Sequence, residues 1–224
     1  MRFNFSKNIS DQREIMIKEH LIGRGIRDPT VLAAMREVPR EAFVVEGMEG
    51  LAYEDNPLPI DEGQTISQPY IVAYMIEALE LSAADRVLEI GTGSGYAAAV
   101  LSRIVTTVHT VERLAGLARS AAQRLEMLGY SNIQVHIGDG TLGWPEHAPY
   151  DAIVVTAGAP DVPKPLLEQL AIGGRLIIPV GLTSYLQMLV RVRRVAEQDY
   201  RSEDLCSVRF VPLIGTAGWR YSND

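Results

Sequence analysis

The chain has 224 residues and a formal net charge of −7; hydrophobic residues make up 47% of it and charged residues 22%. This length and composition are typical of one globular domain with an appendage and exclude disorder along the whole chain. The acidic balance argues against a nucleic-acid-binding protein, which needs a basic face to displace the counterions of phosphates. We therefore expect no nucleic-acid partner.

Cysteine content and hydropathy restrict the environment of the protein. The single cysteine, Cys206, allows neither an internal disulfide nor a multi-cysteine zinc site, and its strand-like surroundings predict a small buried side chain. No apolar run approaches the roughly 18 residues that a membrane span needs. The first residues lack the apolar stretch and cleavage site of a secretory signal. We therefore expect a cytoplasmic protein without membrane contact.

The first predicted helix begins at a capping box. Asp11 and Glu14 have the spacing of that motif, and five apolar residues between positions 15 and 22 supply the body of the helix. Gly23 and Gly25 follow, and glycine is the residue that most often ends a helix. The pattern predicts a helix that starts at Asp11 and stops before Gly25.

Two further helices and a loop complete the first 80 residues. Asp28 before Pro29 is typical of an N-cap followed by a proline at the first helical position, and Pro39 ends the helix that begins there. Residues 53–60 contain two prolines and several turn formers, which predicts a loop. The run Ser67-Gln-Pro69 opens a third helix.

From residue 85 onward, short apolar strands alternate with helices. The predicted strands are 86–90, 108–111, 133–137, 152–155 and 176–180, and the predicted helices are 96–104 and 114–128. Continuous Val/Ile/Leu runs are typical of parallel strands that are buried on both faces, and their alternation with helices predicts a doubly wound sheet. Residues 186–192 partly alternate in polarity, as antiparallel strands do. Residues 208–213 predict a second such strand, with Pro212 at its end or on an edge.

The predicted fold class is therefore α/β, with a mostly parallel, doubly wound, Rossmann-like sheet and antiparallel C-terminal strands. Residues 1–80 form an N-terminal helical segment, and residues 81–224 form the core. We expect the two to pack as one compact unit. The chain contains no internal repeat and no low-complexity tract.

A glycine loop is the strongest chemical signal. Gly91, Gly93 and Gly95 lie between a predicted strand and a predicted helix, where the backbone must turn tightly and can approach a ligand because glycine has no Cβ. The dinucleotide fingerprint is G-x-G-x-x-G, but here the third glycine comes one residue early and Tyr96 takes its place. The loop therefore favours a cofactor other than a dinucleotide.

Acidic residues flank the loop in a particular order. Glu112 ends the second predicted strand, where a carboxylate accepts hydrogen bonds from ribose hydroxyls. Glu89 adds a negative charge before the loop, which suits a cationic ligand. Asp139 and Gly140 follow the third strand, where an aspartate can accept from an adenine amino group. Each acid alone is typical of a solvated strand end, but the ordered set resembles the S-adenosylmethionine site of Rossmann-like methyltransferases.

Longer stretches resemble one methyltransferase family, the protein-L-isoaspartate O-methyltransferases. The matching stretches are residues 63–69, 87–95, 138–140, 149–153, 173–181 and 209–213. The glycine loop is shared with many methyltransferases, whereas the run Thr65-Ile-Ser67-Gln-Pro69 is specific to this family. Tyr70 stands where some members carry a histidine. The resemblance covers most of the chain but not residues 215–224.

The resemblance implies a reaction and a set of site residues. The reaction is methyl transfer from S-adenosyl-L-methionine to the free α-carboxylate of L-isoaspartyl residues in damaged proteins, which starts their repair through a succinimide. It implies no metal, and it implies a monomer whose partners are isoaspartyl proteins and peptides. Ser67 is implied as the active-site serine. The implied cofactor positions are Gln64, Thr65, Ile66, Glu89, Gly91, Gly93, Glu112, Asp139 and Gly140.

The chemistry agrees with these residues. An α-carboxyl group has a pKa of about 3.5 and is ionised at pH 7, so the reaction needs no general base. Alignment and desolvation are then the sources of catalysis. Ser67 is expected to orient the substrate by a hydrogen bond; its alternative role is to cap the helix before Pro69. We assign no catalytic role to the four histidines, His20, His109, His136 and His147, and we expect Tyr185 and Trp219 to serve in packing.

Three other functions stay open at this point. A nicotinamide-dependent dehydrogenase shares the strand, the glycine loop and the ribose acid, but the early third glycine and Glu89 count against it. A methyltransferase of the same fold that acts on RNA or a small metabolite is disfavoured by the net charge and by the motif around Ser67. A binding module without activity is disfavoured by the intact Ser67, Glu112 and Asp139.

Overall fold

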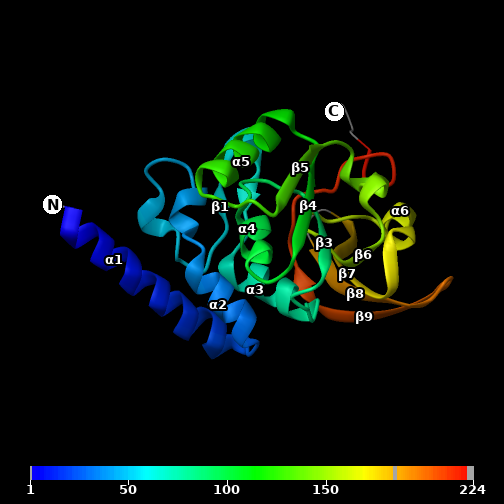
Figure 1. Cartoon of the computed structure of the whole chain (residues 1–224), viewed down its shortest axis with the longest axis horizontal. Helices are drawn as coiled ribbons and strands as arrows, with labels where there is room; N and C mark the ends of the chain where they lie inside the picture. Colours follow the sequence, from blue (N-terminus) through cyan, green and yellow to red (C-terminus); the bar gives the residue numbers. More distant parts are fainter. Residues whose placement is uncertain (1, 184–185, 221–224) are drawn as a thin grey trace.

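The computed structural model describes residues 2–183 and 186–220, so Tyr185 lies outside the described residues. A seven-stranded sheet with the order β5-β4-β3-β6-β7-β8-β9 forms the centre of the molecule. Figure 1 shows α4 and α5 on one side of this sheet and α6 on the other, while α1 extends away from the body. No helix within the described ranges has the length and apolar character needed to cross a membrane.

Five strands pair in parallel and confirm the predicted doubly wound core. They are β3 (Arg86–Ile90), β4 (Thr107–Glu112), β5 (Ile133–Ile137), β6 (Tyr150–Val155) and β7 (Leu170–Thr183). The helices between them are α4 (Tyr96–Ser102), α5 (Ala115–Met127) and the short α6 (Lys164–Glu168), which the sequence analysis missed. Val87 on β3 pairs with Val108 and Ala152 on either side, so the middle of the sheet is apolar on both flanks.

The C-terminal strands are antiparallel, but one of them differs from the prediction. β8 (Leu186–Ala196) pairs with β7 as expected, whereas its other partner is β9 (Asp199–Val208), which contains only Val208 of the predicted strand 208–213. β9 is the edge strand and most of its residues are exposed and polar, which hid it from a search for apolar runs. Pro212 forms only an isolated bridge with Gly158. Cys206, predicted to be buried, lies in β9 and is only partly buried.

The first helix begins earlier than predicted. α1 spans Arg2–Ile15 and continues through a π-helical turn, Met16–Leu21, and a 3-10 turn, Ile22–Arg24. Gly25 ends it in the left-handed conformation, with φ of 105°. The predicted start at Asp11 is wrong because the three-residue spacing of a capping box is also close to one turn in the interior of a helix.

The next elements carry the loop and motif that precede the sheet. The carboxylate of Asp28 accepts hydrogen bonds from Thr30 N (2.7 Å) and Val31 N (3.3 Å), so the predicted N-cap of α2 (Pro29–Glu37) is confirmed. The predicted loop ends in a two-residue strand, β1 (Leu58–Pro59), which pairs with β2 (Thr65–Ile66). α3 (Pro69–Ala78) then begins at the predicted proline. The remaining 3-10 turns are Arg40–Phe43, Glu49–Leu51, Asp61–Gly63, Gly140–Leu142 and Pro145–His147.

Two apolar clusters cover the two faces of the sheet. One contains residues of the N-terminal helices, such as Met35, together with Tyr96 of α4 and Val108 of β4. The other contains Leu88 of β3 and Leu166 of α6. Because the N-terminal helices share a cluster with the sheet, α3 and the motif before it are held against the sheet.

Candidate active site

A cavity of about 230 Å³ lies at the carboxyl ends of β3, β4 and β6. In open parallel sheets this edge is where ligands bind. Six of the predicted cofactor residues line it: Gln64, Thr65, Gly91, Gly93, Glu112 and Gly140. The structure therefore brings the glycine loop, the acid that ends β4 and the segment before α3 to one place.

The glycine loop is held by hydrogen bonds that leave no room for a side chain at Gly91. Thr156 lies directly after β6. Its hydroxyl group donates a shared hydrogen bond to the carbonyl oxygens of Ile90 (3.0 Å) and Gly91 (2.9 Å). Gly91 has φ of +97°, and a Cβ on it would lie 2.4 Å from Thr156 Oγ1. Thr156 also lines the cavity, and sequence reasoning missed it although it follows a predicted buried strand.

Glu112 presents a fixed carboxylate to the cavity. Its Oε2 accepts from Gly93 N and its Oε1 accepts from Leu114 N, both at 3.0 Å. The residue is 7% exposed. Each carboxylate oxygen has a second lone pair, so the group can still accept from two hydroxyls of a ribose.

Glu89 lies beneath the loop and does not line the cavity. Thr110 donates its hydroxyl to Glu89 Oε2 (2.6 Å), while Glu89 Oε1 is buried without a partner among the described residues. Complete burial raises the pKa of Glu89 to about 8, and the nearby Glu112 adds to the rise. The group is therefore protonated at pH 7 in the ligand-free protein, in contrast to the negative charge expected from the sequence.

The carboxylate of Asp139 accepts hydrogen bonds from Thr141 and from the C-terminal segment. Its Oδ1 accepts from the backbone N (2.9 Å) and the hydroxyl (2.6 Å) of Thr141, and its Oδ2 accepts from Thr216 N (2.7 Å). Burial alone would raise the pKa of Asp139, but the hydrogen bonds from Thr141 and Thr216 outweigh it and hold the pKa below its usual range. Asp139 is absent from the cavity wall, whereas Leu213 and Ile214 of the segment that it holds form part of it.

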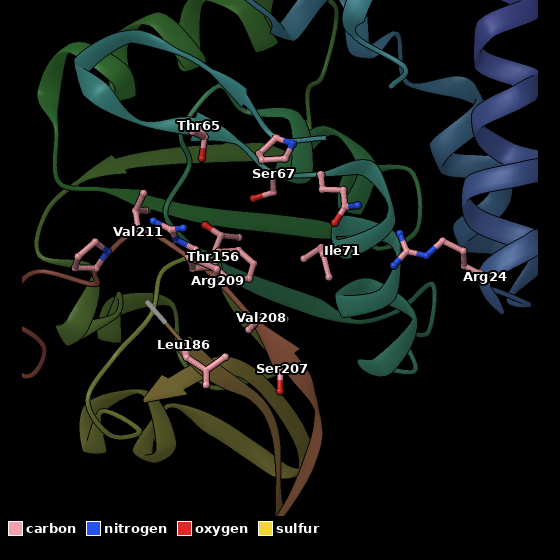
Figure 2. A pocket seen from close by; sticks show the side chains of 14 residues that line it. Arg24, Thr65, Ser67, Ile71, Thr156, Leu186, Ser207, Val208, Arg209 and Val211 are labelled. Carbon is pink, nitrogen blue, oxygen red and sulfur yellow. The ribbon is translucent and has the colours of Figure 1, made fainter. Parts of the chain in front are cut away.

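Ser67 lines a second, larger cavity of about 900 Å³. The two cavities adjoin, because four residues line both: Thr65, Thr156, Val211 and Pro212. Figure 2 shows Thr65 and Ser67 on one side of this cavity and Arg209 and Val211 on the other. Ile66, between Thr65 and Ser67, is 3% exposed and packs into the core.

The larger cavity is suited to an anion. Of the described residues that line it, Arg24 and Arg209 are charged and none is acidic, in a chain whose net charge is −7. Apolar side chains such as Ile71 and Val208 supply much of the remaining wall. The charge of Arg24 is partly balanced by the carboxylate of Asp55, 2.5 Å from its Nη1, so an anionic group that enters meets mainly the charge of Arg209 and loses part of its water shell.

The histidines lie outside both cavities. His109, His136 and His147 are far apart in the sequence but pack around Trp144, with ring centroids 5.4, 4.6 and 4.4 Å from it. His147 lies in a 3-10 turn and not in an irregular loop. In the part of the chain that the structure describes, no group of three or more His, Cys, Asp or Glu side chains is arranged to hold a metal ion. Trp219 is also outside the cavities and donates its Nε1–H to Gly158 O (3.0 Å).

Known proteins similar to this chain share one description. The family model described as protein-L-isoaspartate(D-aspartate) O-methyltransferase (PCMT) matches residues 11–218. The protein-L-isoaspartate O-methyltransferase 1 of Geotalea uraniireducens is 80% identical over 219 residues, which cover 98% of this chain and 100% of that protein. The protein-L-isoaspartate O-methyltransferase 2 of Pelobacter propionicus is 76% identical over 213 residues, which cover 95% of each chain.

Solved structures agree with these relatives. One described as a protein-L-isoaspartate O-methyltransferase superposes with a TM-score of 0.84 at 34% identity, covering 92% of this chain and 67% of that one. A Plasmodium falciparum structure described as a beta-aspartate methyltransferase (PCMT) in complex with S-adenosyl-L-homocysteine gives a TM-score of 0.78 at 26% identity, covering 91% of this chain and 98% of that one. The region matched by the family model includes every residue that lines the two cavities.

Proposed function

Since the chain belongs to the protein-L-isoaspartate(D-aspartate) O-methyltransferase family, we propose that its two adjoining cavities hold the cofactor and the substrate of that reaction. The enzyme is S-adenosyl-L-methionine-dependent and methylates the free α-carboxylate of L-isoaspartyl residues in damaged proteins, which starts their repair through a succinimide. The observation that carries the assignment of sites is the shared wall of the two cavities, formed by Thr65, Thr156, Val211 and Pro212. A methyl group can cross only between sites that are in direct contact.

The smaller cavity fits the cofactor by the chemistry of its donors and acceptors. Glu112 presents a carboxylate to ribose hydroxyls, and Gly91 and Gly93 expose backbone that no Cβ covers. Glu89 lies under the same loop with its Oε1 unpartnered, and a positively charged ligand nearby would lower the pKa of this carboxyl and favour its ionised form. When bound, S-adenosyl-L-methionine supplies the methyl group, whose bond to sulfur breaks as a carboxylate oxygen bonds to its carbon.

Ser67 orients the acceptor in the larger cavity. Its hydroxyl donates a hydrogen bond to one carboxylate oxygen of the isoaspartyl residue, so that the other oxygen faces the shared wall. The carboxylate is already ionised at neutral pH and needs no base. Arg24 and Arg209 attract the anion, and the apolar wall removes water from it. Catalysis in this proposal consists of alignment and desolvation.

Several expectations stay predictions beside this function. Family membership removes the dehydrogenase and the RNA or metabolite methyltransferase as functions of the chain. The absence of a metal requirement, the monomeric state, the absence of nucleic-acid partners and the cytoplasmic location stay predictions. The role of residues 1–80 as the segment that carries the substrate motif is part of the proposal, because Ser67 and Arg24 both come from it.

The reaction is tested with two synthetic peptides that differ only in an aspartyl or an isoaspartyl linkage. Incubation with methyl-labelled S-adenosyl-L-methionine should label the isoaspartyl peptide alone, as a base-labile ester. Labelling of neither peptide, with the cofactor still bound, would overturn the substrate assignment.

The role of Ser67 is tested by Ser67→Ala. The variant should bind the cofactor with an unchanged Kd, while kcat/KM for the isoaspartyl peptide falls about 10- to 100-fold, the range of a hydrogen bond to a charged group. Calorimetric titration of the cofactor and initial rates with the peptide measure the two quantities. Normal turnover would remove Ser67 from the mechanism.

A further inference from the structure

A remote carboxylate caps the helix that follows Ser67. Pro69 is the first residue of α3 and has no N–H, so Tyr70 supplies the first helical donor. Gln68 occupies the N-cap position, and its side chain makes no capping hydrogen bond. Tyr70 N instead donates to Asp55 Oδ1 (3.2 Å), from a loop fifteen residues earlier in the chain. Asp55 therefore accepts the hydrogen bond that the side chain of an N-cap residue such as serine usually accepts.

Asp55 also holds the residue next to Ser67. Gln68 Nε2 donates to both the main-chain oxygen and Oδ2 of Asp55, each at 2.8 Å. Arg24, at the wall of the larger cavity, donates to the same Oδ2 from its Nη1 (2.5 Å). The Asp55 side chain is only 16% exposed, so its bonds to Gln68 and Tyr70 are partly shielded from water, whereas the Arg24 side chain is 44% exposed. Asp55 therefore restrains Gln68 through its side chain and Tyr70 through its backbone N–H.

Arg40 fixes the same peptide from the side of the core. Its guanidinium is fully buried and donates from Nη2 to Ser67 O (2.8 Å) and from Nε to Ala52 O (2.7 Å). Its charge lies over the ring of Tyr96, 4.7 Å from the centroid. The carbonyl of Ser67 thus points inward to Arg40, which leaves its side chain directed to the cavity, as Figure 2 shows.

We propose that Asp55 is a positioning residue for methyl transfer, with Arg40 as its counterpart on the core side. By capping α3, Asp55 keeps the hydroxyl of Ser67 available to the substrate carboxylate. Without that carboxylate, Tyr70 N lacks an acceptor, and Ser67 Oγ, three residues earlier, stands at the spacing of a helix-capping side chain. The hydroxyl is then drawn to the helix and away from the cavity. The inference rests on the proposed contact between Ser67 and the substrate.

A double-mutant cycle tests the inference. Asp55→Ala, Ser67→Ala and the double variant are compared in kcat and KM for the isoaspartyl peptide and in Kd for S-adenosyl-L-methionine. We expect Asp55→Ala to lower kcat by about tenfold or more, as a small misplacement of a reacting partner does, with Kd unchanged. The double variant should be no slower than Ser67→Ala, because Asp55 acts through that hydroxyl. Independent, multiplicative losses would overturn the proposal.

A matched control separates positioning from simple loss of a cap. Asp28 also caps a helix with its carboxylate, since its Oδ1 accepts from Thr30 N and Val31 N at the start of α2, and it lines neither cavity. Asp28→Ala should lower Tm through the loss of its cap but leave kcat unchanged. An equal loss of kcat in Asp28→Ala would show that any lost cap slows the enzyme, and the positioning role would fall.

Two outcomes keep this inference distinct from the proposed function. Full turnover in Ser67→Ala would remove the role of Ser67 itself, whereas impaired turnover in Ser67→Ala together with multiplicative losses would remove only the role of Asp55.

If Asp55→Ala does not fold, Asp55→Asn replaces it in the cycle. Asn keeps one oxygen for Tyr70 N, but its amide nitrogen can accept from neither Gln68 nor Arg24. We therefore expect kcat to fall less, and again only when Ser67 is present. A loss of equal size in the Ser67→Ala background would contradict the proposal.

Discussion

At the scale of single residues, the environment of Glu89 differs most from what its sequence neighbours indicate. The residue ends up fully buried between the glycine loop and Thr110, with one oxygen bonded and the other unpartnered. Removal of a carboxylate from water without a cationic partner favours the neutral form. A residue that the sequence marks as a negative charge is therefore a neutral acid in the ligand-free protein at pH 7, since burial raises its pKa to about 8.

This burial predicts how stability depends on pH. The folded-state pKa of about 8 lies above the usual value near 4.3, so the folded protein binds the extra proton between these two values. The free energy of unfolding gains its full contribution from this proton below the lower pKa. That contribution is lost as the pH rises from the lower pKa to about 8, and it amounts to several kcal/mol in order of magnitude. Glu89→Gln, which is neutral at every pH, should flatten this fall.

The measurement is the free energy of unfolding in urea at pH 5, 7 and 9 for both proteins. As the pH rises, the free energy of unfolding should fall less in Glu89→Gln than in the parent protein. Parallel pH profiles of the two proteins would contradict the assignment of the proton to Glu89.

At the scale of elements, the C-terminal segment after β9 is a wall of the cofactor cavity. Residues 208–213 are mostly apolar and resemble a strand, yet only Val208 belongs to β9, and residues 209–213 have no strand partner beyond an isolated bridge. Instead, Leu213 and Ile214 line the cavity. Thr216 N and Ala217 N hold the segment by donating to Asp139 Oδ2 (2.7 Å) and Thr141 Oγ1 (3.0 Å).

Gly215→Ala should displace this segment. A Cβ at Gly215 would lie 2.0 Å from Asp139 Oδ1, so the Asp139 carboxylate and the segment bonded to it must separate. We expect the Kd for S-adenosyl-L-methionine to rise about tenfold, equivalent to ~1.4 kcal/mol of lost contact with the wall. Isothermal titration calorimetry measures it.

Gly50→Ala is the matched control for this substitution. A Cβ at Gly50 meets no atom within 4 Å, so its Kd should equal that of the parent. An unchanged Kd in Gly215→Ala would mean that the segment does not contribute to the cofactor cavity.

At the scale of the whole molecule, the N-terminal helices and the sheet are joined by a shared core and by Arg175. Its guanidinium on β7 donates to the carbonyls of Leu79 (2.6 Å) and Glu80 (2.8 Å), which follow α3. It also forms an ion pair with Asp85 (2.8 Å), and both side chains are nearly buried. These bonds hold the end of α3 against the sheet. Ser67, two residues before the start of α3, lines the larger cavity.

We therefore expect the two parts to unfold together. Arg175→Met keeps the aliphatic stem but removes the ion-pair partner of Asp85, whose Oδ2 then keeps only the hydrogen bond from Ser82 N. The loss should cost about 2–3 kcal/mol and lower Tm by about 4–12 °C for a chain of this size. Differential scanning calorimetry should show a single transition in the parent and in the variant. Two separate transitions would contradict the prediction that residues 1–80 and 81–224 form one unit.

Several features of the protein could be predicted because their signals are local in the sequence. The parallel strands, the glycine loop, Glu112 at the end of β4 and the N-cap at Asp28 depend on residues a few positions apart, because periodicity and capping act over one or two turns. The resemblance around Ser67 likewise lies in one short run. The structure confirmed the fold and brought six of the predicted cofactor positions to one cavity wall.

Burial and long-range hydrogen bonds determine which of these side chains line a cavity and which are bonded within the protein. Glu89 and Ile66 are buried, and Asp139 is bonded to Thr216, 77 residues away. Arg40 and Asp55 reach the peptide of Ser67 and the first turn of α3 from 27 and 15 residues away. Whether an acidic or hydroxyl side chain is free to bind depends on such distant partners and on burial, and neither is encoded in the local pattern around that residue.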